Sequence, residues 1–288
     1  MASVTVKHLW KEYGDQVVLE NLNLHIADRE FVTIIGSSGC GKTTFLRMLL
    51  GIEQPTKGQL LIDGQPVPAE PGPDRGIVFQ RYSLFPHLSV LDNLMLGLEL
   101  SGSRFLGKLF GARRREALEK AEHLLEAIGL HAARDKYPSQ LSGGMQQRLS
   151  IAQSVIREPK ILLLDEPFGA LDPGITADMH EIILRLWQAN RMTIFMITHD
   201  LKESFQLGTR LLVFDKRRHD PHAPERYGAT VTYDIPLNRK KHTTPMPVLT
   251  AELGKDTGVR PATHSGNPLL NSPQHAPLIR QTMQSPPP

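Results

Sequence analysis

Cysteine is almost absent from this chain of 288 residues, and long apolar stretches are absent altogether. Because Cys40 is the single cysteine, no disulfide can form within the chain, which is typical of proteins from reducing compartments. No stretch approaches the roughly 18 consecutive apolar residues that a membrane-spanning helix needs. Residues 1–7 also lack the charged-then-apolar pattern of a secretory signal. These absences lead us to expect a soluble, intracellular protein.

A basic excess is also missing from most of the chain. The net charge of +3 arises at the C-terminal end, where residues 236–288 contain six basic and two acidic side chains. The preceding residues contain 27 basic and 28 acidic side chains and are therefore close to neutral. A domain that binds nucleic acid usually carries a basic excess of its own, so the composition argues against that class of partner.

Apolar periodicity is absent from residues 236–288, which are rich in proline, small polar and basic residues and end in three prolines. Such a segment cannot bury enough apolar surface to offset the entropy lost when it is ordered. We therefore predict a domain over residues 1–235 and a disordered, proline-rich tail over residues 236–288. A short binding segment around residues 248–253 is the alternative for part of that tail.

What the sequence does contain is a glycine-rich stretch between an expected strand, residues 31–35, and an expected helix, residues 45–50. Glycines let the backbone approach an anion closely, and a helix N-terminus offers unsatisfied N–H groups. Lys42 adds a charge for the β- and γ-phosphates, and the hydroxyl of Thr43 can ligate Mg²⁺. We predict a nucleotide-phosphate site, which follows the pattern G-x-x-x-x-G-K-[ST] and consists of Gly36, Ser37, Ser38, Gly39, Cys40, Gly41, Lys42, Thr43 and Thr44.

A second turn of this kind consists of Ser142, Gly143 and Gly144 and precedes a stretch with helical spacing, residues 149–156. Serine and glycine at a helix N-terminus again form a geometry that suits an anion. A small enzyme that handles one nucleotide has no evident use for a second site of this type. The turn therefore indicates a more elaborate arrangement than one loop and one nucleotide.

Polar side chains follow three apolar stretches that we expect to be buried strands. Asp165 and Glu166 follow residues 161–164, Gln80 follows residues 76–79, and His199 follows residues 193–197. Ligands bind at the carboxyl ends of parallel strands, and two adjacent carboxylates there need a cation or hydrogen-bond donors. Mg²⁺ beside Asp165 and a water beside Glu166 would meet that need. Gln80 could be an ordinary surface residue, but its strand would finish beside the phosphate loop. His199 could be structural, or it could reach a γ-phosphate.

The other elements have weaker signals. Apolar and polar residues partly alternate with period two in residues 4–9 and 17–26, which predicts antiparallel strands. Tyr13, in the turn between them, either packs against other residues or offers its aromatic face to adenine. Residues 88–130 have helical spacing and predict a helical block. Its basic run, residues 113–115, is either a solvated face or a contact for a partner or for lipid head groups. Residues 211–214 and 230–233 predict late strands.

These motifs together resemble the ATP-binding cassette (ABC) family of transport ATPases, in order and in spacing, over about residues 3–215. The segment from Leu141 to Arg148 is the most specific of them, since other phosphate-loop ATPases lack it. The resemblance implies an α/β fold: a P-loop NTPase (RecA-like) core with an antiparallel β subdomain and an inserted helical subdomain at about residues 88–150. It also implies ATP hydrolysis with Mg²⁺.

The resemblance implies a role for each candidate residue. Tyr13 would stack on adenine, and the stretch 36–44 would hold the phosphates. Thr43, Gln80 and Asp165 would serve the metal. Glu166 would be the base that positions the attacking water, with Lys42, Gln80 and His199 at the γ-phosphate. The turn of Ser142, Gly143 and Gly144 would contact the ATP of an opposite subunit.

A head-to-tail dimer would explain the second turn, because each subunit would close the ATP pocket of the other. Residues 71–80 and 88–93 resemble the importer branch for nitrate, sulfonates and taurine. That branch implies a homodimer or a paired ATPase subunit on the cytoplasmic face of the inner membrane. Its partners would be an integral-membrane permease and, indirectly, a periplasmic or lipid-anchored solute-binding protein.

The alternative is a soluble ABC ATPase that acts on nucleic acid or ribosomes. Such proteins usually carry two cassettes or a long coiled coil, whereas this chain has one cassette and only about a hundred residues between Thr44 and Leu141. The chain departs from the importer branch after Asp215, where a charged segment, residues 216–233, replaces a short glycine-containing strand. This departure leaves the solute open and does not affect the expected ATPase.

Overall fold

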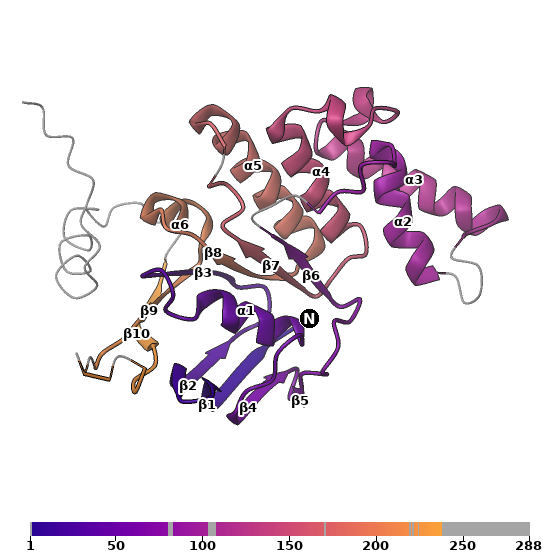
Figure 1. Cartoon of the computed structure of the whole chain (residues 1–288). Coiled ribbons are helices and arrows are strands. Elements are labelled where there is room, and N and C mark those ends of the chain that lie inside the picture. Colours follow the sequence, from indigo (N-terminus) through magenta and orange to yellow (C-terminus); the bar gives the residue numbers. More distant parts are fainter. Residues whose placement is uncertain are drawn as a thin grey trace, which may run out of the picture.

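The computed structural model describes residues 2–79, 83–102, 108–169, 171–218, 220, 222–223 and 225–237. These residues form two β-sheets with helices between and beside them (Figure 1). The mixture of a largely parallel sheet and a separate antiparallel sheet confirms the α/β fold class predicted from the sequence. None of the helices within these ranges combines the length and the apolar character that crossing a membrane requires.

The larger sheet has six strands, and its inner strands are buried on both faces. Five strands run parallel and β10 pairs antiparallel with β9 at one edge. All residues of the run 161–164 are buried, which is why this stretch is continuously apolar instead of alternating. The strand order is β10 (Thr230–Pro236), β9 (Arg210–Asp215), β3 (Phe31–Gly36), β8 (Thr193–Ile197), β7 (Ile161–Asp165) and β6 (Arg75–Val78).

The smaller sheet is antiparallel, and one face of it packs against helix α1 (Lys42–Leu50). Val4, Val6 and Leu24 point into this core together with Phe45 and Leu49 of α1. Helix α1 therefore lies between the two sheets (Figure 1). The strand order is β2 (Gln16–Ile26), β1 (Val4–Tyr13), β4 (Lys57–Ile62) and β5 (Gln65–Pro66).

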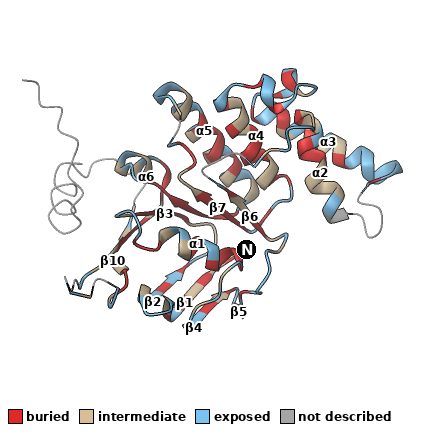
Figure 2. Ribbon diagram, viewed as in Figure 1, coloured by how far each residue is buried: buried red, intermediate tan, exposed pale blue. Residues whose placement is uncertain are grey.

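The remaining helices cover the opposite face of the larger sheet and extend to one side of it. Between β6 and β7 the chain forms α2 (Val90–Gly102), α3 (Gly111–Ala127), two short 3₁₀ turns (His131–Ala133 and Pro138–Gln140) and α4 (Gly143–Val155). This is the part of the sequence in which a helical subdomain was expected. Buried residues concentrate on the strands and on the inner sides of α4 and α5 (Pro173–Asn190), while much of α3 is exposed (Figure 2).

The chain returns to the smaller sheet near its C-terminal end. After α6 (Leu201–Leu207) and β9, the connection to β10 brings Ala229 beside Leu19 of β2. β10 ends at Pro236, and the N–H of Leu237 donates a hydrogen bond to the carbonyl oxygen of Thr209 at 2.7 Å. Residues 238–288, which include most of the predicted tail and its alternative binding segment, lie outside the described residues.

Candidate active site

The glycine-rich stretch joins the carboxyl end of β3 to the start of α1, and close packing explains two of its glycines. A Cβ at Gly36 would lie 2.2 Å from the carbonyl oxygen of Phe214, on the neighbouring strand. Gly41 has a φ of 87°, and a Cβ there would lie 2.7 Å from Cδ2 of Leu19. Only glycine fits at these positions, so the loop can wrap closely around the helix N-terminus.

Lys42 lies inside this loop. Its ammonium group donates hydrogen bonds to the carbonyl oxygens of Gly36 and Ser37, both at 2.8 Å. These contacts hold a positive charge at the N-terminus of α1, where the helix dipole is also positive. The combination creates a small region that strongly favours an anion.

Asp165 and Thr43 connect the end of β7 to the start of α1. The Thr43 hydroxyl donates a hydrogen bond to Oδ2 of Asp165 at 3.1 Å. Burial raises the pKa of Asp165, and the nearby carboxylate of Glu166 raises it further. The Thr43 hydrogen bond and the charge of Lys42 act against this rise. Two oxygen-bearing side chains therefore face each other beside the loop, one of them a partly desolvated carboxylate.

Glu166 and His199 lie at the ends of the neighbouring strands β7 and β8. Nδ1 of His199 is 3.9 Å from Oε2 of Glu166, within ion-pair distance when the imidazole is protonated. Glu166 has a φ of 47°, and its N–H donates a hydrogen bond to the carbonyl oxygen of Ile197 at 3.1 Å. A non-glycine residue in this left-handed region is strained, and such strain often accompanies a functional side chain.

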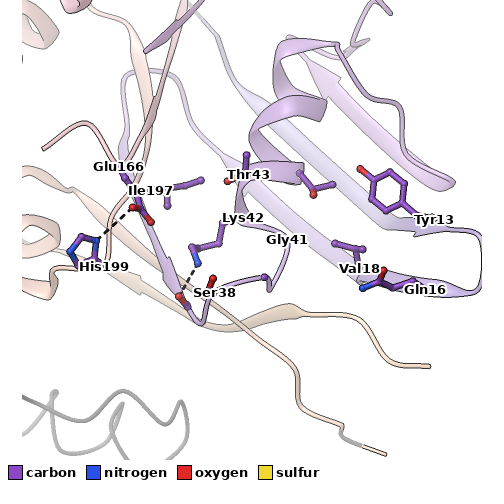
Figure 3. A pocket seen from close by; sticks show the side chains of 13 residues that line it. Tyr13, Gln16, Val18, Ser38, Gly41, Lys42, Thr43, Glu166, Ile197 and His199 are labelled. Carbon is purple, nitrogen blue, oxygen red and sulfur yellow. Dashed lines mark hydrogen bonds and ion pairs between the residues drawn. The ribbon is translucent and has the colours of Figure 1, made fainter. Parts of the chain in front are cut away.

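Lys42, Thr43, Glu166 and His199 meet at one cavity of about 470 Å³ (Figure 3). Glu166 and His199 lie at one end, and the ammonium group of Lys42 lies between them and Tyr13 at the other end. Among the predicted residues, Ser37 and Cys40 belong to the loop without lining the cavity. Asp165 does not line it either and is connected to it through its hydrogen bond with Thr43, and Gln80 lies outside the described residues. The lining consists of Tyr13, Gln16, Val18, Gly36, Ser38, Gly39, Gly41, Lys42, Thr43, Thr44, Glu166, Ile197 and His199.

Tyr13 forms the far wall of the cavity with Gln16 and Val18 of β2. Its ring is 45% exposed and its hydroxyl donates a hydrogen bond to Glu53. Partial burial raises the pKa of Tyr13, and the contact with Glu53 adds to the rise. The ammonium group of Lys11 lies 4.8 Å from the ring centroid. This wall offers an aromatic ring and an apolar side chain, which suit a flat base.

Three of the lining residues, Gln16, Val18 and Ile197, were not predicted from the sequence. The turn between β1 and β2 pairs Tyr13 directly with Gln16, and Val18 follows two residues later on the same strand. A two-residue hairpin turn at Gly14 and Asp15 was therefore the sequence signal that could have placed Gln16 and Val18 beside Tyr13. Ile197, the last residue of β8, lies two positions before His199 and was assigned only to the buried strand.

The second glycine-rich turn lies away from this cavity. The hydroxyl of Ser142 accepts a hydrogen bond from the N–H of Met145 at 3.3 Å and so caps α4. Ser142 and Gly143 are exposed, whereas a Cβ at Gly144 would lie 2.6 Å from Cγ2 of Ile175 on α5. None of the three residues of this second turn lines the cavity, so within one chain the two turns do not share a site.

The chain is similar in sequence to known ATP-binding proteins of transporters. A family model described as ABC transporter matches residues 19–169. The nitrate import ATP-binding protein NrtD of Synechocystis sp. is 45% identical over 204 residues, which are 71% of this chain and 73% of that protein. The aliphatic sulfonates import ATP-binding protein SsuB of Bacillus anthracis is 35% identical over 216 residues, covering 75% of this chain and 81% of that protein.

A solved structure agrees in fold. It is the dimeric structure of a post-hydrolysis state of the ATP-binding cassette MJ0796 bound to ADP and Pi. The two chains superpose with a TM-score of 0.65 at 28% identity, covering 82% of this chain and 99% of that one. The region matched by the family model includes both glycine-rich turns and the carboxylates of Asp165 and Glu166. The chain therefore belongs to the ABC transporter family, as one of its ATP-hydrolysing cassettes.

Proposed function

We propose that this chain is the ATP-hydrolysing subunit of an importer and that it works on a separate integral-membrane permease at the cytoplasmic face of the inner membrane. The observation that carries the proposal is the convergence of Lys42, Glu166 and His199 on one cavity. The names of the relatives support the importer assignment, since both are import ATP-binding proteins. The near-neutral charge of residues 1–235 is a further argument against a nucleic-acid substrate.

The phosphates of ATP would lie in the glycine-rich loop. The N–H groups at the start of α1 and the ammonium group of Lys42 would bind the β- and γ-phosphates. Lys42 now donates to the carbonyl oxygens of Gly36 and Ser37, and the same ammonium can turn to a phosphate without crossing the cavity. The adenine would rest against Tyr13 and Val18 at the other end.

Mg²⁺ fits the side chains beside the loop. Thr43 and Asp165 contribute hard oxygen atoms 3.1 Å apart, and the described residues contain no cluster of three or more His, Cys, Asp or Glu that could hold a metal ion. A site with few protein ligands suits Mg²⁺, which keeps several waters and binds substrate phosphates. The ion would neutralise charge on the β- and γ-phosphates. Gln80 is our candidate for an additional ligand.

Glu166 would accept the proton of the attacking water and orient it toward the γ-phosphate. Its side chain is 32% exposed, so it can reach a water while the turn at φ 47° fixes its backbone. His199, 3.9 Å away and 70% exposed, would contact the γ-phosphate. Phosphoryl transfer needs little covalent help from the protein, so positioning and charge carry the rate.

The second glycine-rich turn would act in a head-to-tail dimer. Ser142 and Gly143 are exposed and lie outside the cavity, as expected if they serve the ATP of the opposite subunit. The dimeric structure of the MJ0796 cassette supports this arrangement. ATP would favour the closed dimer and hydrolysis would release it, which couples the nucleotide to the permease.

The solute would be small and polar, of the nitrate, sulfonate or taurine type. The two relatives are named for nitrate and for aliphatic sulfonates, so the names agree on a small anion and differ in its identity. A periplasmic or lipid-anchored solute-binding protein would deliver the solute to the permease. Uptake of labelled nitrate and taurine by vesicles that contain the chain, its permease and its solute-binding protein would test the class, and uptake of neither would contradict it.

Glu166→Gln tests the ATPase site. The amide cannot accept the proton of water, so steady ATP hydrolysis should fall at least about a hundredfold while ATP binding is kept. With ATP and Mg²⁺ the variant should accumulate as a dimer, measured by light scattering. Glu181→Gln is the matched control, because Glu181 is an exposed carboxylate on α5 that pairs with Arg185. Hydrolysis by Glu166→Gln near the wild-type rate would remove Glu166 from its proposed role.

A further inference from the structure

A largely buried histidine lies behind the cavity without lining it. The side chain of His180, on α5, is only 12% exposed. Its ring packs edge-on against Phe168, with 4.8 Å between the centroids, and its Nδ1 lies 3.1 Å from Oε1 of Gln206 on α6. Its Nε2 is buried, has no hydrogen-bond partner among the described residues and lies 3.9 Å from Oε1 of Glu203. A polar ring on α5 therefore lies between α6 and the turn that contains Phe168.

Glu203 connects this histidine to the segment that carries His199. The Glu203 carboxylate, 13% exposed, accepts a hydrogen bond from the hydroxyl of Thr198. The same hydroxyl accepts a hydrogen bond from the N–H of Asp200 at 3.0 Å. Glu203 thereby holds Thr198 directly, and it reaches Asp200, on the other side of His199, only through the Thr198 hydroxyl.

Phe168 connects the histidine to the segment that carries Glu166. Phe168 is 3% exposed and lies two residues after Glu166 in the same turn. The N–H of the next residue, Gly169, donates a hydrogen bond to the carbonyl oxygen of Glu166 at 3.4 Å. A Cβ at Gly169 would lie 3.7 Å from Cε1 of His199, so this turn and His199 are immediate neighbours.

An imidazole and a carboxylate that are both largely buried are energetically unfavourable side chains between packed elements. Burying polar groups that are incompletely hydrogen-bonded costs free energy, and apolar residues of similar volume often stabilise a protein more. His180 and Glu203 therefore need a reason other than packing. The contacts suggest one. The His180 ring touches the turn after Glu166 and lies 3.9 Å from the Glu203 carboxylate, which bonds the residue before His199.

We propose that His180 and Glu203 form a positioning pair that sets the placement of Glu166 relative to His199 for ATP hydrolysis. The inference rests on the proposed roles of Glu166 and His199. Neither member of the pair lines the cavity, so neither would touch ATP. The pair would act on the hydrolytic step by holding the two side chains at the γ-phosphate, and it would contribute little to ATP binding.

Two variants test the pair in the full-length chain. His180→Phe keeps the aromatic contact with Phe168 and removes both ring nitrogens. Glu203→Gln keeps an acceptor for Thr198 and removes the charge that faces His180. Each should lower kcat for ATP about tenfold or more while KM changes less than about twofold, because small misplacements of reacting groups affect the chemical step. The double variant should be no slower than the slower single variant, since the two residues act as one unit.

His123→Phe is the control, since His123 is an exposed imidazole on α3 whose side chain is 83% exposed. Thermal melts establish that each variant is folded, and Glu203→Gln alone decides the question if His180→Phe does not fold. An unchanged kcat, or a rise in KM that matches the loss of kcat, would overturn the proposal. Those results together with an inactive Glu166→Gln would refute only the positioning pair, whereas an active Glu166→Gln would refute the proposed function itself.

Discussion

The chain contains two glycine-rich turns that begin helices, and the structure treats them differently. The first turn leads into α1 and lines a cavity in which Lys42, Glu166 and His199 meet. The second turn leads into α4, is exposed at Ser142 and Gly143, and lines no part of that cavity. Both helix N-termini favour anions to a similar degree, since both expose unsatisfied N–H groups. A helix N-terminus alone therefore does not distinguish them, although Gly41 before α1 is left-handed and Ser142 before α4 is extended.

The surroundings of the two turns make the difference. The first turn lies at the carboxyl ends of β3, β7 and β8, where side chains from distant parts of the sequence converge. At the second turn, the Ser142 hydroxyl is already bonded to the N–H of Met145. A helix N-terminus becomes a phosphate site only when other elements add charge and shape to it. For the second turn, we propose that a partner subunit brings the phosphate.

Lys42→Ala should produce the largest change in ATP binding. A charged hydrogen bond to phosphate contributes up to about 3 kcal/mol, so the Kd for ATP should rise roughly a hundredfold. Calorimetric titration of the variant with ATP measures this directly. Lys57→Ala is the control, because Lys57 is an exposed lysine that pairs with Glu12 on the smaller sheet. An unchanged titration would show that the first turn works without its lysine and would erase the difference between the two turns.

Ser142→Ala should have a smaller effect, and only on hydrolysis. The loss of one hydrogen bond to a charged group predicts about a tenfold lower kcat, whereas ATP binding to a single chain should not change. ATPase assays and titrations at low protein concentration separate the two quantities. A weaker affinity of the monomer for ATP would place the second turn near the cavity of its own chain and would contradict the dimer.

Mixing the two variants sharpens this test. A dimer of one Lys42→Ala chain and one Ser142→Ala chain would contain two different sites. One site would carry both substitutions. The other would be intact, because the Ser142→Ala chain supplies an unchanged Lys42 and the Lys42→Ala chain supplies an unchanged Ser142. The mixture should therefore hydrolyse ATP faster than the average of the separate variants. Activity equal to that average would mean that the two turns never share a nucleotide.

The parts of the fold that could be predicted are those with a strong local signal. Residues 161–164 are uniformly apolar because both faces of the sheet are covered. The loop 36–44 has the pattern G-x-x-x-x-G-K-[ST], which is specific for phosphate-binding loops. These signals predicted that Lys42 follows one buried strand and that Asp165 and Glu166 follow another. The family and the α/β class predicted from them are confirmed. The roles of the individual residues stay predictions.

Contacts between distant side chains could not be read from the sequence. Nothing local to Tyr13 indicates that its hydroxyl meets Glu53, forty residues away, and nothing local to His180 indicates that it faces Glu203. The irregular pairing of β1 with β2, which shifts register between Val6 and Leu9, has no clear sequence signal either. Such features depend on how whole elements pack, and periodicity carries no information about that.

Asp165→Asn should have the smallest effect, a change in the stability of the nucleotide-free protein. Because Asp165 bonds Thr43 at the first turn, this change can be compared with that of Ser142→Ala in the second turn. Because burial raises the pKa of Asp165, the folded state favours the protonated carboxyl, and stability falls as the pH rises through that raised pKa. At neutral pH the ionised carboxylate therefore costs stability, and asparagine removes the cost. Each kcal/mol regained should raise the Tm by about 2–4 °C in a chain of this size.

The gain should disappear on acidification toward the ordinary aspartate pKa of 3.8, where the wild-type carboxyl is itself protonated. Asp178→Asn, which removes an exposed carboxylate paired with Arg148, should show no such gain. Ser142→Ala should instead lower the Tm, because loss of a helix cap costs about 1 kcal/mol. Opposite signs would mean that Asp165, beside the first turn, lowers the stability of the folded chain, whereas Ser142 in the second turn raises it by capping α4. A Tm for Asp165→Asn below that of the wild type at neutral pH would contradict this contrast.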